Sequence, residues 1–222
     1  MSNLQKRILT SLIILPLSIF FIFKGEDLLI LFLFTVFFVA NYELFSVFNK
    51  KITVLFLDLV LILSLFSIYY LRDQGAQSFK LLLWVIILCV CSDIGGYIFG
   101  KTFKWKTLTR ISPNKTLSGA LGSLMFSLLS VFIADAFLPY ILDIPLDSFS
   151  INLFEAKFLF LAIIFSLMAQ SGDLAISYFK RLEKIKDTGK ILPGHGGIFD
   201  RIDGLMFVVI LTLLLIKFNI IP

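Results

Sequence analysis

The sequence predicts an all-α, polytopic bundle of about seven transmembrane helices with a cytoplasmic N-terminus. Three observations carry this prediction: the chain is 59% hydrophobic and only 16% charged, it contains seven long apolar runs, and its basic residues gather in alternate loops. An ordinary soluble domain is about half apolar and about a quarter charged. Because a water-soluble core of this size cannot hide the excess, we expect lipid as the solvent and a single integral membrane domain over residues 1–222.

Each apolar run approaches the roughly 20 residues that a membrane-crossing helix needs. The predicted spans are 8–23, 28–48, 52–71, 79–99, 117–142, 156–179 and 204–221. The first follows Lys6 and Arg7 and has no small-residue cleavage site behind it, so we expect a retained span rather than a signal peptide.

The loops predict the orientation. With the N-terminus in the cytoplasm, 15 of the 20 Lys and Arg residues fall on the cytoplasmic side, as the positive-inside rule requires. The net charge of +5 therefore reflects membrane orientation, and we expect no nucleic-acid partner. The two longest cytoplasmic loops, 100–116 and 180–203, are both basic and both contain Pro and Gly.

Several acidic residues fall within or near the spans, where an ionised carboxylate costs several kcal/mol unless it faces protein or water. Asp58 stands alone among apolar residues, and a structural role for it is about as plausible as a functional one. Asp135 is near an external end and is expected to reach water. We expect Glu43, near the end of its span, to lie at the membrane interface.

Two further aspartates begin polar stripes that run down helix faces into the two basic loops. The stripes have i, i+4, i+8 spacing and consist of Asp93, Tyr97 and Lys101, and of Asp173, Ser177 and Arg181. They are either contacts between helices or the walls of one polar cavity open to the cytoplasm.

One tempting motif is rejected. Gly95 to Thr102 satisfies the Walker A pattern G-x-x-x-x-G-K-T, but a true P-loop joins a strand to a helix in an α/β domain. Here the pattern ends an apolar span, so we expect no phosphate loop. Cys89 and Cys91, both within the same span, are expected to act as small hydrophobic residues.

The second basic loop carries the most specific pattern in the chain. It reads Ser177-x-x-Lys180-Arg181, Lys186-Asp187, Pro193-Gly194-His195-Gly196-Gly197 and Asp200-Arg201-x-Asp203. The first loop contributes Ser92-Asp93, Tyr97, Gly100 and Ile111-Ser112-Pro113-Asn114-Lys115-Thr116. Together these resemble the signatures of the phosphatidate cytidylyltransferase family. The chain departs from the family pattern at Ser118, where an acidic residue is usual, and at Gly204, where Ser is usual.

The resemblance implies an enzyme that forms CDP-diacylglycerol and pyrophosphate from CTP and phosphatidic acid, with Mg²⁺ as cofactor. Lys6 and Arg7 beside a retained first span fit a bacterial inner membrane, and the basic loops place the expected active site on the cytoplasmic face. We expect residues 1–75 to be peripheral spans and residues 76–222 to be the catalytic spans. The chain is short for the family, so we expect some peripheral N-terminal helices to be missing. A homodimer is left open. The alternatives are a related membrane lipid or polyprenol kinase, and an ion or solute transporter.

The resemblance also implies residue roles. The expected Mg²⁺ ligands are Asp173, Asp187, Asp200 and Asp203, since carboxylate oxygens suit this ion. The expected catalytic residues are Asp187, Asp200, Asp203, Lys180 and Arg181. The expected substrate-binding residues are Ser177, Lys186, His195, Gly196, Gly197, Arg201, Ser112, Lys115, Thr116 and Asp93.

For some of these residues the sequence leaves more than one role open. Asp200 and Asp203 would also be favourable simply as carboxylates at a helix N-terminus. A helix-start role for Thr116 or Ser118 stands as the alternative to phosphate or nucleotide contact. For His195, the sole histidine, substrate contact and proton handling both remain open.

Overall fold

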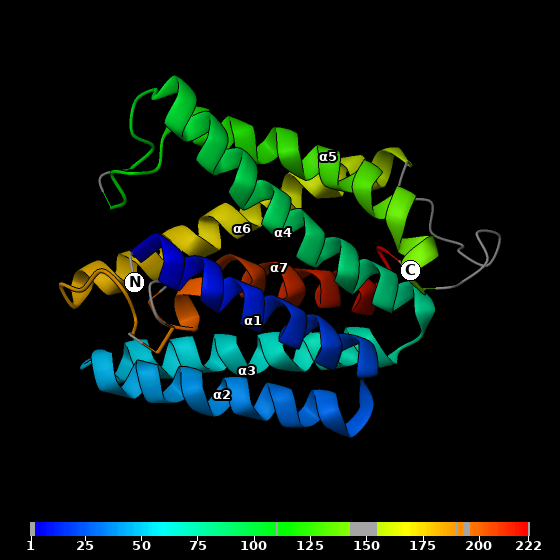
Figure 1. The fold of residues 1–222 in the computed structure, drawn as a ribbon, viewed down its shortest axis with the longest axis horizontal. Helices are drawn as coiled ribbons and strands as arrows, with labels where there is room; N and C mark the ends of the chain where they lie inside the picture. Colours follow the sequence, from blue (N-terminus) through cyan, green and yellow to red (C-terminus); the bar gives the residue numbers. More distant parts are fainter. Residues whose placement is uncertain (1–2, 110, 143–154, 190, 193–195, 222) are drawn as a thin grey trace.

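The computed structural model describes residues 3–109, 111–142, 155–189, 191–192 and 196–221 (Figure 1). These residues form seven α-helices, and within them only two isolated β-bridges and no strand occur. The helices are α1 (Asn3–Lys24), α2 (Glu26–Val47), α3 (Lys51–Asp73), α4 (Ala76–Phe103), α5 (Leu117–Leu142), α6 (Ala156–Leu182) and α7 (Phe199–Lys217). The predicted all-α class is confirmed.

The helices follow the predicted spans, but α1 begins at Asn3 where 8 was predicted, and α4 runs from Ala76 to Phe103 where 79–99 was predicted. The difference that bears on the site is at α7. The α5 helix matches 117–142, whereas α7 begins at Phe199, five residues before the predicted start at 204. The charged stretch from Asp200 to Asp203 is therefore helical and not part of the preceding loop. Five helices, α2 to α6, are long and apolar enough to cross a membrane, and the apolar part of α1, Leu12–Lys24, is shorter.

The helices are arranged around α7. In Figure 1, α2 and α3 lie together on one side of the bundle, the α4–α5 hairpin lies on the opposite side, and α1, α6 and α7 lie between them. The α7 helix contacts α3, α4 and α6. The two loops predicted to carry the chemistry, α4–α5 and α6–α7, emerge at the same end of the bundle (Figure 1).

Two apolar clusters hold this arrangement together. In the first, the buried Trp84 ring of α4 lies 5.5 Å from the Phe165 ring and 5.8 Å from the Phe158 ring of α6, measured between centroids. In the second, Leu57 and Leu61 of α3 belong to the same buried cluster as Phe199 and Met206 of α7 and residues of α2. The α7 helix contributes to both clusters, with Val208 and Val209 in the first and Phe199 and Met206 in the second, so its burial stabilises its place in the bundle.

Close packing of α4 against α5 explains the glycines of the Walker-like pattern. A Cβ atom on Gly122 would lie 2.5 Å from the Gly95 carbonyl oxygen, and one on Gly96 would lie 2.6 Å from Ser123 Oγ. Small residues allow two helix backbones to approach this closely. Because Gly95 to Thr102 is helical throughout, the rejection of a P-loop is confirmed.

Gly95→Ala is therefore expected to destabilise the hairpin by about 1–3 kcal/mol, the usual cost of overpacking. A methyl group there would collide with the backbone of Gly122, which cannot move aside. At Gly100 the nearest atom to an added Cβ is the Thr116 hydroxyl oxygen, 3.2 Å away, so Gly100→Ala is the matched control. Thermal unfolding in detergent measures both variants, and an equal loss of stability in the two would contradict this account.

Candidate functional site

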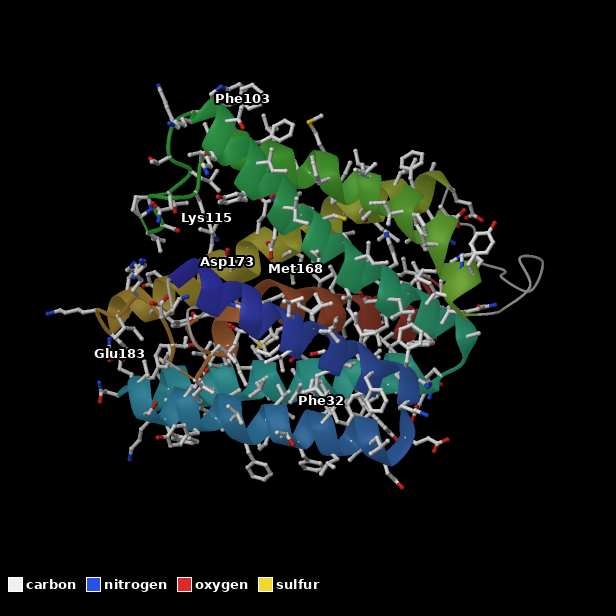
Figure 2. All side chains as sticks on the ribbon, in the orientation of Figure 1. Phe32, Phe103, Lys115, Met168, Asp173 and Glu183 are labelled. Carbon is white, nitrogen blue, oxygen red and sulfur yellow. The ribbon has the colours of Figure 1, made fainter. Side chains whose placement is uncertain are left out.

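A cavity of about 320 Å³ lies between the α4–α5 hairpin and the α6–α7 pair. Its polar and charged lining residues are Ser92, Asp93, Tyr97, Asn114, Lys115, Thr116, Ser123, Gln170, Asp173, Arg201 and Asp203. The labelled side chains in Figure 2 show Lys115, from the α4–α5 loop, and Asp173, from α6, facing each other across the gap between these elements. Asp93 and Tyr97 of the first polar stripe and Asp173 of the second line this one cavity, whereas Lys101, Ser177 and Arg181 do not. The membrane-side ends of the two stripes therefore share a polar cavity.

The cavity combines acidic and basic side chains. Asp93, Asp173 and Asp203 supply three carboxyl groups, and Lys115 and Arg201 supply two cationic groups. Lys115 Nζ forms an ion pair with Asp173 Oδ2 at 2.5 Å, and both side chains remain partly exposed. With all five groups ionised, the lining keeps one excess negative charge, so it suits a cation together with an anionic ligand.

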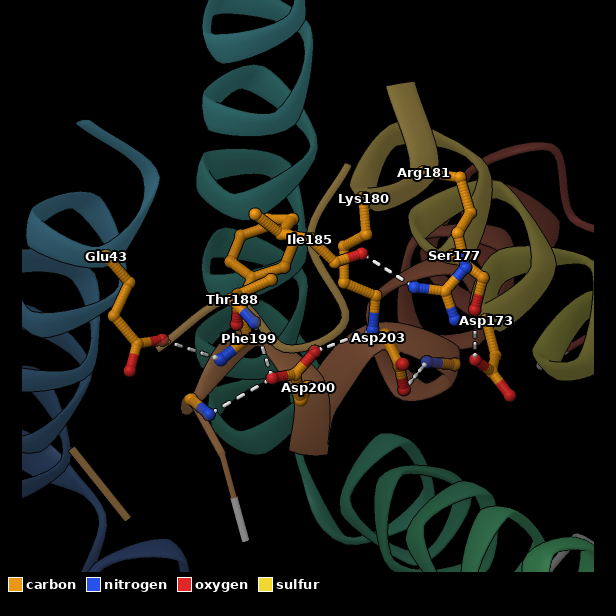
Figure 3. Close-up of polar contacts among 12 residues, drawn as sticks. Glu43, Asp173, Ser177, Lys180, Arg181, Ile185, Thr188, Phe199, Asp200 and Asp203 are labelled. Atoms are coloured by element: carbon orange, nitrogen blue, oxygen red, sulfur yellow. Dashed lines mark hydrogen bonds and ion pairs between the residues drawn. The ribbon is translucent and has the colours of Figure 1, made fainter. Parts of the chain in front are cut away.

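Local hydrogen bonds orient these groups. Ser177 Oγ donates to Asp173 Oδ1 at 3.4 Å, and the backbone N–H of Gly204 donates to Asp203 Oδ1 at 2.8 Å (Figure 3). Thr116 Oγ1 accepts from the backbone N–H of Gly119 at 3.1 Å, so Thr116 caps the start of α5. The predicted helix-start role of Thr116 is confirmed, although its side chain also lines the cavity.

The two departures from the family pattern have local explanations. Ser118 shares a hydrogen bond of 3.0 Å with Thr116 Oγ1, so its hydroxyl belongs to the capping structure at the start of α5. At Gly204, a Cβ atom would lie 3.1 Å from the Ala169 carbonyl oxygen, which leaves little room between α6 and α7.

Asp200 lies in a second, buried cluster outside the cavity lining. Its Oδ1 accepts a hydrogen bond from Lys180 Nζ at 2.7 Å, and its Oδ2 accepts from the backbone N–H groups of Thr188 at 2.8 Å and Gly197 at 3.1 Å (Figure 3). The side chains of Lys180 and Asp200 are 9% and 4% exposed. Although Asp200 and Asp203 share the first turns of α7, only Asp203 reaches the cavity.

Arg181 connects the two loops. Its guanidinium donates to the carbonyl oxygen of Ile111 at 3.4 Å, in the first loop, and to that of Ile185 at 2.6 Å, in the second. Arg181 and Lys186 line an open depression next to Ile111 and Pro113, separate from the lining of the cavity. The neighbouring Ser112 donates its backbone N–H to Thr109 Oγ1 at 3.3 Å.

Asp187 and Gly196, two more of the predicted residues, lie next to each other ahead of α7. Gly196 has φ +88°, a left-handed conformation that favours glycine, and a Cβ atom there would lie 3.3 Å from Asp187 Cβ. Asp187 therefore sits beside this turn and does not line the cavity. His195 falls outside the described residues.

Sequence reasoning missed the burial of Glu43 and missed Gln170. Glu43 lies near the end of α2, and its position at the membrane interface stays a prediction, but its side chain is enclosed by protein: it is 1% exposed, and its Oε2 accepts the backbone N–H of Phe199 at 3.3 Å (Figure 3). Gln170 lines the cavity three residues before Asp173. Extending the second polar stripe by one helical turn toward the membrane would have found it.

The donor chemistry of the cavity fits a divalent cation, because carboxylate oxygens are the ligands that Mg²⁺ prefers. Among the described residues, no three or more His, Cys, Asp or Glu side chains already converge as a ready-made metal site. Of the four carboxylates predicted as metal ligands, Asp173 and Asp203 line the cavity and could contribute, and Asp93 is a third carboxylate in the same lining.

Long apolar helices surrounding a cavity lined by both acids and bases define an integral membrane protein with a polar ligand site. The chain belongs to the cytidylyltransferase family, whose model matches residues 48–219. This range contains every residue that the sequence predicted for the site, and it excludes Glu43.

Curated relatives agree with this membership. The chain is 39% identical over 145 residues to a phosphatidate cytidylyltransferase of Helicobacter pylori, an alignment covering 65% of this chain and 48% of that protein. It is 41% identical over 150 residues to the phosphatidate cytidylyltransferase of Staphylococcus saprophyticus (67% and 54%), and 40% identical over 151 residues to that of Staphylococcus aureus (67% and 53%). The chain spans about half the length of the curated relatives that it matches.

Proposed function

We propose that this protein is a Mg²⁺-dependent CTP:phosphatidate cytidylyltransferase that forms CDP-diacylglycerol and pyrophosphate. The observation that carries the proposal is the cavity in which Asp93, Asp173 and Asp203 face Lys115 and Arg201, within the part of the chain that matches the family. The proposed substrates are CTP and phosphatidic acid, as the names of the relatives suggest.

The reaction requires an oxygen of the phosphatidic acid phosphate to attack the α-phosphorus of CTP, with pyrophosphate leaving. Both reactants are anionic, so the site must offset their repulsion and hold them in line. When bound, a divalent cation supplies charge neutralisation and alignment. We propose that Asp173 and Asp203 hold this cation, with Asp93 beside them, and that Arg201 and Lys115 bind phosphate oxygens.

The size of the cavity is compatible with binding a cation and the reacting phosphates. At about 320 Å³ it is at the lower end of small-molecule sites, which range from about 300 to 1,000 Å³. It can hold the reacting phosphates, while the acyl chains of the lipid stay in the surrounding bilayer. We propose that Arg181 and Lys186, in the neighbouring depression, contact the outer phosphates of the nucleotide.

We propose a structural role for the buried Lys180–Asp200 pair and a ligand-binding role for the loop beside it. The contacts of Asp200 and Lys180 favour a pair that holds the α6–α7 loop against α7, rather than an open metal ligand. Asp187 and Gly196 lie in this loop, and His195 belongs to the same motif. We propose that this segment borders the bound phosphates, with Asp187 as an additional cation ligand.

The proposal includes the membrane arrangement. All seven helices cross a bacterial inner membrane, with residues 1–75 peripheral and the N-terminus cytoplasmic. The concentration of Lys and Arg in the α4–α5 and α6–α7 loops supports a site on the cytoplasmic face, where CTP is available. Lipid then enters from the inner leaflet.

The function is tested with purified protein, labelled CTP and vesicles containing phosphatidic acid. We expect a CDP-lipid product that requires both phosphatidic acid and Mg²⁺, that disappears with excess EDTA and that returns when Mg²⁺ is restored. Thin-layer chromatography separates the outcomes. A phosphorylated polyprenol would favour the kinase alternative, and solute flux in proteoliposomes without nucleotide would favour a transporter.

A further inference from the structure

The α7 helix begins with backbone amides that its own sequence does not cap. Its N-cap residue is Ile198, and among the described residues no side chain of the helix itself caps this end. The first amides of a helix lack partners within the helix and must find them elsewhere. Here the partner comes from α2: Glu43 Oε2 accepts the N–H of Phe199 at 3.3 Å.

The carboxyl group of Glu43 is enclosed by the α6–α7 loop. A Cβ atom on Gly189 or Gly197 would come under 3.0 Å from the Glu43 carboxylate, so these two glycines let the loop backbone close over it. Glu43 is 1% exposed although it is an acid. A carboxylate this deeply buried is favoured at a helix N-terminus, where the amides and the helix dipole stabilise negative charge.

Glu43 and Asp200 therefore hold the same segment from two sides. Asp200 binds the backbone of Thr188 and Gly197, while Glu43 binds that of Phe199. Two and four residues after Phe199, α7 places Arg201 and Asp203 at the cavity. A shift of the first turn of α7 would move both of these side chains.

We propose that Glu43 is a positioning residue, which caps α7 from outside the matched range 48–219 and fixes the turn that carries Arg201 and Asp203. Glu43 does not line the cavity, so it acts through the α7 backbone and not on the substrate. The N-terminal helices thereby take part in setting the geometry of the site. Because Arg201 and Asp203 were assigned under the proposed function, the kinetic consequence of this inference rests on that function.

The structural part is tested by hydrogen exchange with mass spectrometry, which needs no enzymatic activity. In Glu43→Ala, peptides containing Thr188, Gly197 or Phe199 are expected to exchange about tenfold faster, in line with loss of a helix cap. Glu43→Gln keeps an acceptor oxygen and should show a smaller change. Thr212→Ala is the control, because among the described residues its hydroxyl bonds just the Val208 carbonyl oxygen, at 2.8 Å, within the apolar part of α7.

The kinetic part is measured below the unfolding temperature of every variant. Glu43→Ala is expected to lower kcat about tenfold or more and to raise the Mg²⁺ concentration for half-maximal activity, as loss of residues that support metal ligands does. Glu43→Gln should recover part of both, and Thr212→Ala should match the unmodified protein. A merely structural role would lower the unfolding temperature and leave kcat of the folded protein unchanged.

Two exchange results would each overturn the proposal: unchanged exchange at the α6–α7 loop in Glu43→Ala, or exchange raised equally in all helices. If the unmodified protein makes no CDP-lipid, the proposed function fails, while the exchange data still decide the role of Glu43. Unchanged kcat and Mg²⁺ dependence, with faster exchange at the loop, would reject positioning and leave only a local structural contact.

Discussion

Asp203→Asn and Asp173→Asn are each expected to lower the rate of CDP-lipid formation at least about 100-fold while the protein still inserts and folds. Both carboxyl groups line the cavity beside Arg201 and Lys115, where the proposed function requires a divalent cation and two phosphates to be held together. The amide is close in shape but neutral, so the change removes charge without removing bulk. Initial rates with labelled CTP, measured at several Mg²⁺ concentrations, give the size of the loss.

Asp58→Asn is the matched control. Asp58 lies within α3, and its Oδ1 is buried without a hydrogen-bond partner among the described residues. Neutralising it should leave activity unchanged and membrane insertion at least as favourable. If Asp173→Asn or Asp203→Asn keeps full activity and unaltered Mg²⁺ dependence, the residue changed in that variant is not a ligand of the proposed metal site.

Asp200→Ala is expected to be among the most destabilising single substitutions in the chain. It leaves the ammonium of Lys180 buried without its carboxylate, which typically costs about 3–5 kcal/mol. It also leaves the N–H groups of Thr188 and Gly197 without their acceptor. Lys180→Met should cost less, because the Asp200 carboxylate keeps both backbone donors. Thermal unfolding in detergent measures this asymmetry.

The double variant Lys180→Met/Asp200→Ala completes this test. Removing the stranded lysine should recover part of the stability that Asp200→Ala loses, so the two effects will not add. Glu155→Ala is the control, since the Glu155–Lys157 pair spans 3.8 Å with both side chains about half exposed and should contribute almost nothing. Equal losses from the two single variants would contradict the hydrogen-bonding pattern around Asp200.

Much of the fold follows from local patterns in the sequence. Long apolar runs separated by basic loops predicted seven helices, and α5 agrees with its predicted bounds. The start of α7 was missed because Asp200, Arg201 and Asp203 read as a polar loop. That turn is helical since Glu43 and Asp200 bind the amides around it, and Glu43 lies 156 residues from Phe199 in the sequence. No local pattern predicts a contact of that separation.

The same distinction applies to the site. Asp93 and Asp173 were found from their helical spacing with other polar residues, which is local information. Two other contacts depend on how the helices pack and have no local signal. Lys115 pairs with Asp173, and Asp200 contacts Lys180 instead of lining the cavity. The sequence therefore predicted which residues gather at this end of the bundle, but not which of them face the ligand.

Under the proposed function, the ion pair between Lys115 and Asp173 couples the binding of the cation to the binding of the anion. An anion that attracts the ammonium of Lys115 frees an oxygen of Asp173 for a cation, and a cation held by Asp173 releases Lys115 toward an anion. Such coupling is reciprocal, because each ligand must raise the affinity for the other by the same factor. Without ligands, Lys115 and Asp173 neutralise each other and connect the α4–α5 loop to α6. A single ion must break this pair to bind, so its binding free energy is less favourable than that of a cation and an anion binding together.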